Sequence, residues 1–176
     1  MLPAHTYRLF VSHRPDLLML YASEFNDLPG SSETTVVDQV AAMAEMPEPL
    51  GLAVENAMFE YQIVETGHHM KSLEDKWFEK QAVTLEHGRN CLAVSLPFPD
   101  NKERSWKIRV KGVTEEESVA LLDELYSWLY QERYLYQHPW QVGDLLIIDN
   151  YGTLHGRTAI SESGVRGLFR GQVNYR

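Results

Sequence analysis

Three side chains near the C-terminus have the types and the spacing needed to hold a metal ion beside a small acid. His155 follows the apolar stretch 145–149, and Arg166 and Arg170 follow this histidine by 11 and 15 positions. A neutral imidazole is a common ligand of transition metals, and guanidinium groups bind carboxylates in a bidentate manner. The two arginines are an even number of positions apart on a predicted strand, which puts them on one face. The alternative is a structural histidine with an ordinary pair of surface arginines.

The run Trp140–His155 (Trp-Gln-Val-Gly-Asp-Leu-Leu-Ile-Ile-Asp-Asn-Tyr-Gly-Thr-Leu-His), taken with the two arginines, resembles the C-terminal signature of the TauD/TfdA family. These are taurine-dioxygenase-like iron(II)/2-oxoglutarate oxygenases. The resemblance implies that His155 is a metal ligand and that Arg166 holds the distal carboxylate of 2-oxoglutarate. It further implies that Arg170 faces the 1-carboxylate or an anionic group of the substrate. Such an iron site has three protein ligands on one face, usually two histidines and a carboxylate.

The segment Gly30-Ser-Ser-Glu-Thr34 resembles the Gly-Gly-Asp/Glu-Thr segment of the same family, with serines in place of the glycines. This resemblance implies that Thr34 forms a hydrogen bond with the 2-oxoglutarate carboxylate beside Arg166. A second interpretation makes Thr34 or Thr35 the N-cap of a helix over 36–46. The two interpretations are compatible with each other.

The first two metal ligands of the family, His-x-Asp/Glu, are expected well before that segment, and His5 stands at the histidine position. Tyr7 occupies the carboxylate position, and no histidine of the chain has an acidic residue two places further on. His13-Arg-Pro-Asp16 has the wrong spacing. A phenol has a pKa of about 10 and binds iron well only as phenolate, so Tyr7 is a poor replacement for a carboxylate. The resemblance therefore implies iron bound by His5 and His155, with a doubtful third ligand.

Composition limits the class of protein and its partners. A chain of 176 residues suits a single domain over 1–176 with a sizeable core. A net charge of −9 argues against a nucleic-acid or anionic-membrane partner. The single cysteine, Cys91, fits a reducing compartment and is most simply a buried residue of a strand. No apolar stretch approaches the ~20 residues of a membrane span and no secretory signal is visible, so we expect a cytoplasmic location.

Strand-like patterns dominate both ends of the chain. Strands are predicted over 17–23, 91–96, 105–110, 145–149 and 168–175. A helix is predicted over 36–46, ending before Pro47, and another from Thr114, where Glu117 completes a capping box. Residues 66–90 are interpreted as loop with one short helical turn near Trp77. The pattern indicates a β-rich α+β jelly roll with helical insertions, and the resemblance narrows it to a double-stranded β-helix.

The resemblance covers the whole chain but only the C-terminal part of a family member, so we expect a double-stranded β-helix that is incomplete at its N-terminus. It implies an oxygenase that uses iron(II), 2-oxoglutarate and dioxygen to hydroxylate or desaturate a small molecule. The ending Arg166–Tyr175 resembles the branch acting in isocyanide natural-product pathways. One alternative is a catalytically impaired remnant that binds a small carboxylate without turnover. Another is a metal-free β-sandwich binding module. A homo-oligomer is compatible with each of these.

Overall fold

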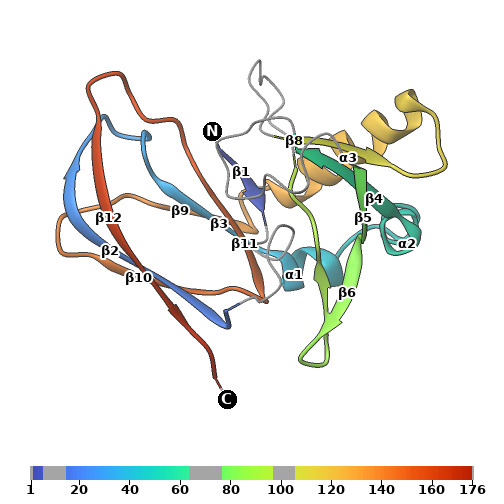
Figure 1. Ribbon diagram of the computed structural model, residues 1–176, viewed down its shortest axis with the longest axis horizontal. Coiled ribbons are helices and arrows are strands. Elements are labelled where there is room, and N and C mark those ends of the chain that lie inside the picture. Colours follow the sequence, from blue (N-terminus) through green and yellow to red (C-terminus); the bar gives the residue numbers. More distant parts are fainter. Residues whose placement is uncertain (1, 6–14, 64–76, 97–105, 176) are drawn as a thin grey trace.

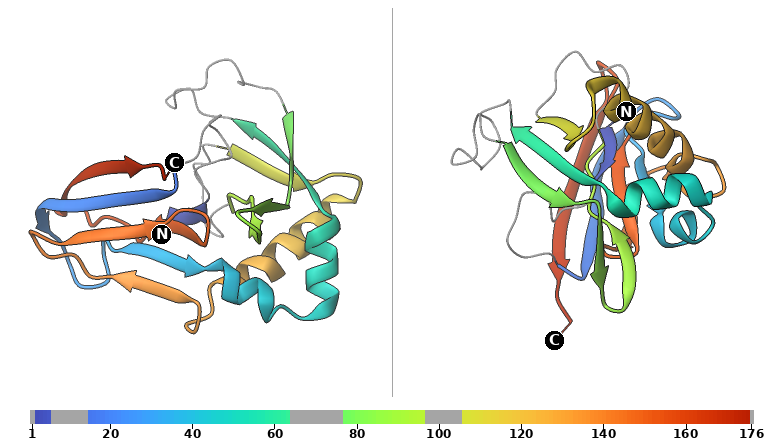
Figure 2. Two further views of the ribbon diagram at one scale, coloured as in Figure 1. Left: turned by 90° about the horizontal axis from the view of Figure 1, so that it is seen from below. Right: turned by 90° about the vertical axis from the view of Figure 1, so that its right-hand side faces the viewer.

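In the part of the chain that the structure describes, two antiparallel sheets form one end of the molecule, and three helices with further strands form the other (Figure 1, Figure 2). The computed structural model describes residues 15–63, 77–96 and 106–175, together with the backbone of residues 2–5. This strand-rich jelly roll with helical insertions confirms the predicted fold class. No helix in the described part of the chain combines the length and the apolar character needed to cross a bilayer.

The first sheet carries the histidine of the C-terminal signature and has the strand order β1-β11-β3-β9. Its strands are β1 (Leu2–His5), β11 (Thr153–Arg157), β3 (Thr34–Asp38) and β9 (Leu135–His138). Leu154 and Val37 are cross-strand partners and both are fully buried in the main core. Because side chains alternate along a strand, Thr34 and His155 lie on the opposite face of this sheet.

The second sheet carries the two arginines and has the order β10-β2-β12. Its strands are β10 (Leu145–Asp149), β2 (Leu17–Asn26) and β12 (Val165–Val173). Leu18, Ala22 and Ile148 are buried on one face. The other face exposes several large apolar side chains, namely Tyr21, Leu145, Ile147 and Phe169. The predicted strands 17–23, 145–149 and 168–175 are confirmed, although β2 runs further and β12 begins earlier.

The helical end of the molecule encloses the main core. Its strands are β4 (Met58–Ile63), β5 (Trp77–Gln81) and β8 (Trp106–Val110) in one sheet, and β6 (Val83–Glu86) and β7 (Arg89–Leu92) in a hairpin. Its helices are α1 (Gln39–Ala44), α2 (Glu48–Asn56) and α3 (Glu115–Leu129). The predicted capping box of α3 is confirmed, because Thr114 and Glu117 bond each other's backbone amides.

Three local predictions were wrong. The strand predicted over 91–96 ends at Leu92, the last residue of β7. The helix predicted over 36–46 begins only at Gln39, because the β-branched Val36 and Val37 pair with neighbouring strands on both sides in β3. Its N-cap is therefore Asp38, whose carboxylate accepts from the amide of Ala41, and not Thr34 or Thr35. The predicted loop is also wrong over 77–90, where strands β5 and β6 and the start of β7 are found; its first part, 66–76, lies outside the described residues.

Candidate metal and carboxylate site

His155 lies in the middle of β11 and is 8% exposed. Its neighbour Leu154 packs into the main core, so His155 belongs to the face of the first sheet that is turned away from that core. On β3 its cross-strand partner is Val36, and on β1 its cross-strand partner is His5. Directly opposed residues of an antiparallel pair have their Cα atoms only about 4.5–5.5 Å apart. The register thus brings together the two positions at which the family resemblance places histidine ligands.

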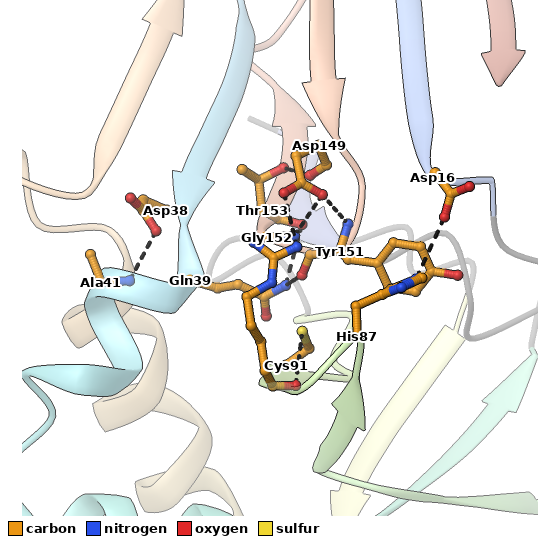
Figure 3. Close-up of polar contacts among 11 residues, drawn as sticks. Asp16, Asp38, Gln39, Ala41, His87, Cys91, Asp149, Tyr151, Gly152 and Thr153 are labelled. Carbon is orange, nitrogen blue, oxygen red and sulfur yellow. Dashed lines mark hydrogen bonds and ion pairs between the residues drawn. The ribbon is translucent and has the colours of Figure 1, made fainter. Parts of the chain in front are cut away.

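The turn before β11 fixes where that strand begins (Figure 3). The carboxylate of Asp149 accepts hydrogen bonds from the amides of Tyr151 at 2.9 Å and Gly152 at 3.0 Å, and its carbonyl accepts from the Thr153 hydroxyl at 2.6 Å. A Cβ atom at Gly152 would lie 2.6 Å from Asp149 Oδ2, which explains the glycine. Burial raises the pKa of Asp149, but the amides of Gly152 and Tyr151 and the charge of Arg89 outweigh burial, so this pKa lies below its ordinary value.

The buried amide of Gln39 ties this turn to two other parts of the fold. Its Nε2 donates to the carbonyl of Tyr151 at 2.6 Å, and its Oε1 accepts from the amide of Leu92 at 2.7 Å. Gln39 is fully buried and directly follows β3. It therefore connects the end of β3, the turn that leads to His155, and β7.

Thr34 joins the two sheets through its side chain. Its Oγ1 accepts one hydrogen bond from Arg166 Nη2 at 2.9 Å and another from Trp140 Nε1 at 3.0 Å. A hydroxyl has two acceptor lone pairs and one proton, so both lone pairs are occupied and the proton remains to be donated. Among the described residues, none accepts it, although Thr34 is only 2% exposed. A buried hydroxyl in this state favours a ligand with an acceptor oxygen.

Arg166 reaches Thr34 from β12 and also donates from Nε to the carbonyl of Ser32 at 3.0 Å. These two contacts confirm the predicted proximity of Thr34 and Arg166 and hold the guanidinium in one orientation. Burial, and after it the positive charge of Arg157, lowers the pKa of Arg166 below its ordinary value. An arginine stays protonated nonetheless, so the site has a fixed positive charge.

The loop before Thr34 is held in place by a buried serine, Ser32, and by the carboxylate of Asp27. Ser32 is fully buried with a φ of 58°, a left-handed conformation that glycine adopts more easily, which explains the glycine in the corresponding family segment. The Ser32 hydroxyl donates to Asp27, as does the Ser161 hydroxyl. These hydrogen bonds, with the Ser161 contact the larger, lower the pKa of Asp27 to about 2. The loop that presents the Ser32 carbonyl to Arg166 is therefore fixed at both of its ends.

The remaining predicted residues are placed less completely. Arg170 lies on the same row of β12 as Arg166, since the extra residue of the β2–β12 bulge, Ser23, belongs to β2. Unlike Arg166, Arg170 is exposed. Tyr7 lies outside the described residues, and His5 is described by its backbone alone. Within residues 15–63, 77–96 and 106–175 no three histidine, cysteine or acidic side chains are grouped closely enough to hold a metal ion.

Sequence reasoning missed three contributors to this site: Trp140 as a hydrogen-bond donor, the carbonyl of Ser32, and Arg157. Trp140 was part of the recognised signature, but only the fold shows that its indole reaches Thr34 across 106 positions. Arg157 follows His155 by two positions, so strand alternation was a signal that could have found it.

Comparison with known proteins agrees with this geometry. Residues 1–172 match the family model described as Taurine catabolism dioxygenase TauD, TfdA family. The chain belongs to this family. One relative in the curated set, 3-((Z)-2-isocyanoethenyl)-1H-indole synthase of Fischerella ambigua, is 23% identical over 96% of the chain and 61% of its own length. Another, Isocyanide synthase A of Aspergillus fumigatus, is 36% identical over 51% of the chain but only 15% of its own length.

Two solved structures with a similar fold are of proteins longer than this TauD, TfdA family chain. PvcB, described as an Fe, alpha-ketoglutarate dependent oxygenase from an isonitrile synthetic pathway, superposes with a TM-score of 0.71 at 22% identity. The match covers 98% of the chain and 56% of PvcB. AAD-2, solved with Mn(II) and N-oxalylglycine, gives 0.73 at 20% identity, covering 97% and 67%. The chain thus spans about 56–67% of these two structures.

Proposed function

We propose that this chain carries the metal and cosubstrate site of an iron(II)- and 2-oxoglutarate-dependent oxygenase that hydroxylates or desaturates a small molecule. The family membership supports the reaction class, and the names of the relatives support a role in natural-product biosynthesis. When bound, iron and 2-oxoglutarate supply the activation of dioxygen, and the protein supplies ligands, orientation and a dry site. We expect the protein to act in the cytoplasm, without nucleic-acid or membrane partners, and a homo-oligomer is compatible with this role.

The observation that carries the proposal is the contact between Arg166 and Thr34. Arg166 brings a positive charge from the second sheet, and Thr34 brings an uncommitted hydroxyl proton from the first. A carboxylate offers two oxygens with about four lone-pair sites and can accept from both groups at once. The distal carboxylate of 2-oxoglutarate has the required charge and acceptor atoms. Arg170, further along the same row of β12, would face the 1-carboxylate or an anionic group of the substrate.

For the metal, we propose His5 and His155 as ligands, on the basis of their direct pairing in the β1–β11 register. Two imidazoles suit iron(II), and the 2-histidine-1-carboxylate set that such oxygenases use needs one more ligand. Tyr7 stands at the expected position of that carboxylate and is the doubtful member of the set. Two of the three expected ligand positions, His5 and His155, therefore carry a side chain that suits iron(II), and the third, Tyr7, does not.

The site residues would then perform two tasks on the cosubstrate. Arg166 and Thr34 fix its distal carboxylate, and with it the direction in which the opposite end points. Trp140, which is 3% exposed, covers the Thr34 hydroxyl and limits the access of water. Removing water strengthens each of these electrostatic contacts, because the local dielectric constant falls.

The proposal is tested by anaerobic titration of iron(II) and 2-oxoglutarate, followed by admission of air. We expect the visible charge-transfer absorbance of an iron–2-oxoacid chelate before air, and release of succinate after it. Absorbance without succinate would favour the carboxylate-binding remnant over the oxygenase. Neither signal, in a chain shown to be folded by circular dichroism, would contradict the proposed function.

A further inference from the structure

Arg157 is the last residue of β11 and lies two positions after His155, on the same face of the first sheet. Its cross-strand partner on β3 is Thr34. The Thr34 hydroxyl, in turn, accepts from Arg166 Nη2, which comes from the second sheet. Arginines from two different sheets therefore lie beside one threonine: Arg166 donates to its hydroxyl, and Arg157 is its cross-strand partner.

No counter-charge for Arg157 is found within the described part of the chain. Arg157 is only partly exposed, yet none of the described carboxylates forms an ion pair or hydrogen bond with it. On β9 the cross-strand partner of Thr34 is His138. The nearby carboxylate of Asp144 already contacts His138 Nε2 at 3.2 Å and accepts a hydrogen bond from the amide of Gln141 at 2.8 Å. The positive charge of Arg157 instead acts on Arg166, whose pKa it helps to lower after the larger effect of burial.

Two like charges at a partly desolvated site repel each other and destabilise the ligand-free protein. The described residues around Arg166 do not neutralise this charge, because Ser32 offers it a carbonyl and Thr34 a hydroxyl, both uncharged. An anion bound between the two guanidinium groups would convert this repulsion into two attractive contacts. The arrangement is therefore complete only with a ligand of negative charge.

We propose that Arg157 is a second cosubstrate-binding arginine, which binds the same distal carboxylate of the 2-oxoacid as Arg166. This inference rests on the proposed function for the identity of the dicarboxylate. Arg166 uses its Nε and one Nη2 proton on Ser32 and Thr34, so part of its donor set is already committed. Among the described residues, none takes any of the five N–H donors of Arg157. The carboxylate accepts from both arginines and from the Thr34 hydroxyl.

The experiment compares Arg157→Gln with the wild type and with Lys107→Gln, which removes one exposed positive charge from β8 at the other end of the molecule. Three ligands are titrated by calorimetry. These are 2-oxoglutarate with Mn(II), 2-oxopentanoate with Mn(II), which lacks the distal carboxylate, and glutarate without metal, which lacks the keto group. Melting temperatures are measured without ligand and with glutarate.

We expect Arg157→Gln to weaken the binding of 2-oxoglutarate and of glutarate by about 10- to 100-fold, the range for loss of a hydrogen bond between charged groups. Its affinity for 2-oxopentanoate should stay within twofold of the wild type, roughly the error of such a comparison. Without ligand, its melting temperature should equal or exceed that of the wild type, because one of two repelling charges is gone. Lys107→Gln should match the wild type throughout.

Undiminished affinity of Arg157→Gln for both dicarboxylates would overturn the inference. An equal loss of affinity for all three ligands would overturn it as well. A lower melting temperature without ligand would mean that Arg157 has a structural role instead. If the wild type binds glutarate but not 2-oxoglutarate with Mn(II), the proposed function fails while the two-arginine site stands. If it binds neither dicarboxylate, both fail.

Discussion

Arg166 and Thr34 are 132 positions apart in the chain, yet the guanidinium Nη2 of one donates to the hydroxyl of the other at 2.9 Å. This contact joins the two sheets of the jelly roll at the point where the signature residues of the sequence meet. Because Trp140 takes the second lone pair of that hydroxyl, its proton is left for an acceptor outside these two contacts.

Thr34→Val should therefore lose cosubstrate affinity while keeping the shape of the side chain. The substitution removes the proton donor and leaves donors of Arg166 and Trp140 without their acceptor, so we expect 2-oxoglutarate to bind about 10-fold more weakly or worse. Thr34→Ser keeps the hydroxyl and is the matched control. Equal affinities of the valine and serine variants, measured by calorimetry, would rule out a direct hydrogen bond to the ligand.

Asp27 makes stability depend on pH in the acid range. Its pKa is lowered from 3.8 to about 2 in the folded chain, so its contribution is fully present above the unfolded value and is lost as the pH falls through the folded one. The wild type should lose more stability than Asp27→Asn between about pH 5 and pH 2. Denaturant unfolding at several pH values measures this difference, and parallel curves for the two proteins would contradict it.

Gln39→Met should destabilise the fold by about 1–3 kcal/mol, because two backbone groups lose a buried partner and the volume is nearly conserved. The groups affected are the carbonyl of Tyr151 and the amide of Leu92. Gln137→Met, at an exposed position of β9, is the control and should change stability by less than about 0.5 kcal/mol. Chemical denaturation compares the two, and similar losses in both would mean that the Gln39 amide does not organise the turn before β11.

Tyr7→Asp should strengthen iron(II) binding. With tyrosine at this position, two neutral imidazoles must hold the cation without a protein charge to offset it, whereas an aspartate would complete the expected ligand set. Iron affinity and succinate release are measured for both forms. Robust turnover by the unmodified chain would show that another carboxylate completes the site. No gain from Tyr7→Asp would mean that this ligand does not limit binding.

The sequence predicted those parts of the fold in which local signals agree. The capping box at Thr114, the alternation before Val110 and the apolar run of β10 each specify one structure on their own. Val36 and Val37 were wrongly predicted to be helical, because the helical spacing of apolar residues extends through them. Only their pairing with β9 and β11 makes them part of a strand. Local signals are weakest where tertiary pairing decides the outcome.

The candidate site was predictable to the extent that it is written in a linear motif. The spacing of His155, Arg166 and Arg170 was visible in one stretch of chain. The acceptor and the donor that complete the carboxylate end were not, because the Ser32 carbonyl and the Trp140 indole reach it only through the packing of one sheet on the other. No periodicity in a sequence specifies which residues of two separate sheets will face each other.

The most direct test of the central claim is a calorimetric titration of N-oxalylglycine into the full chain with Mn(II), for the wild type, Arg166→Gln and His155→Ala. The two variants remove the carboxylate end and the metal end of the site, respectively. We predict measurable binding by the wild type, a loss of at least about 10-fold in Arg166→Gln, and loss of the Mn(II)-dependent part of the affinity in His155→Ala. Wild-type affinity in both variants, with or without the metal, would contradict a metal and carboxylate site between these two sheets.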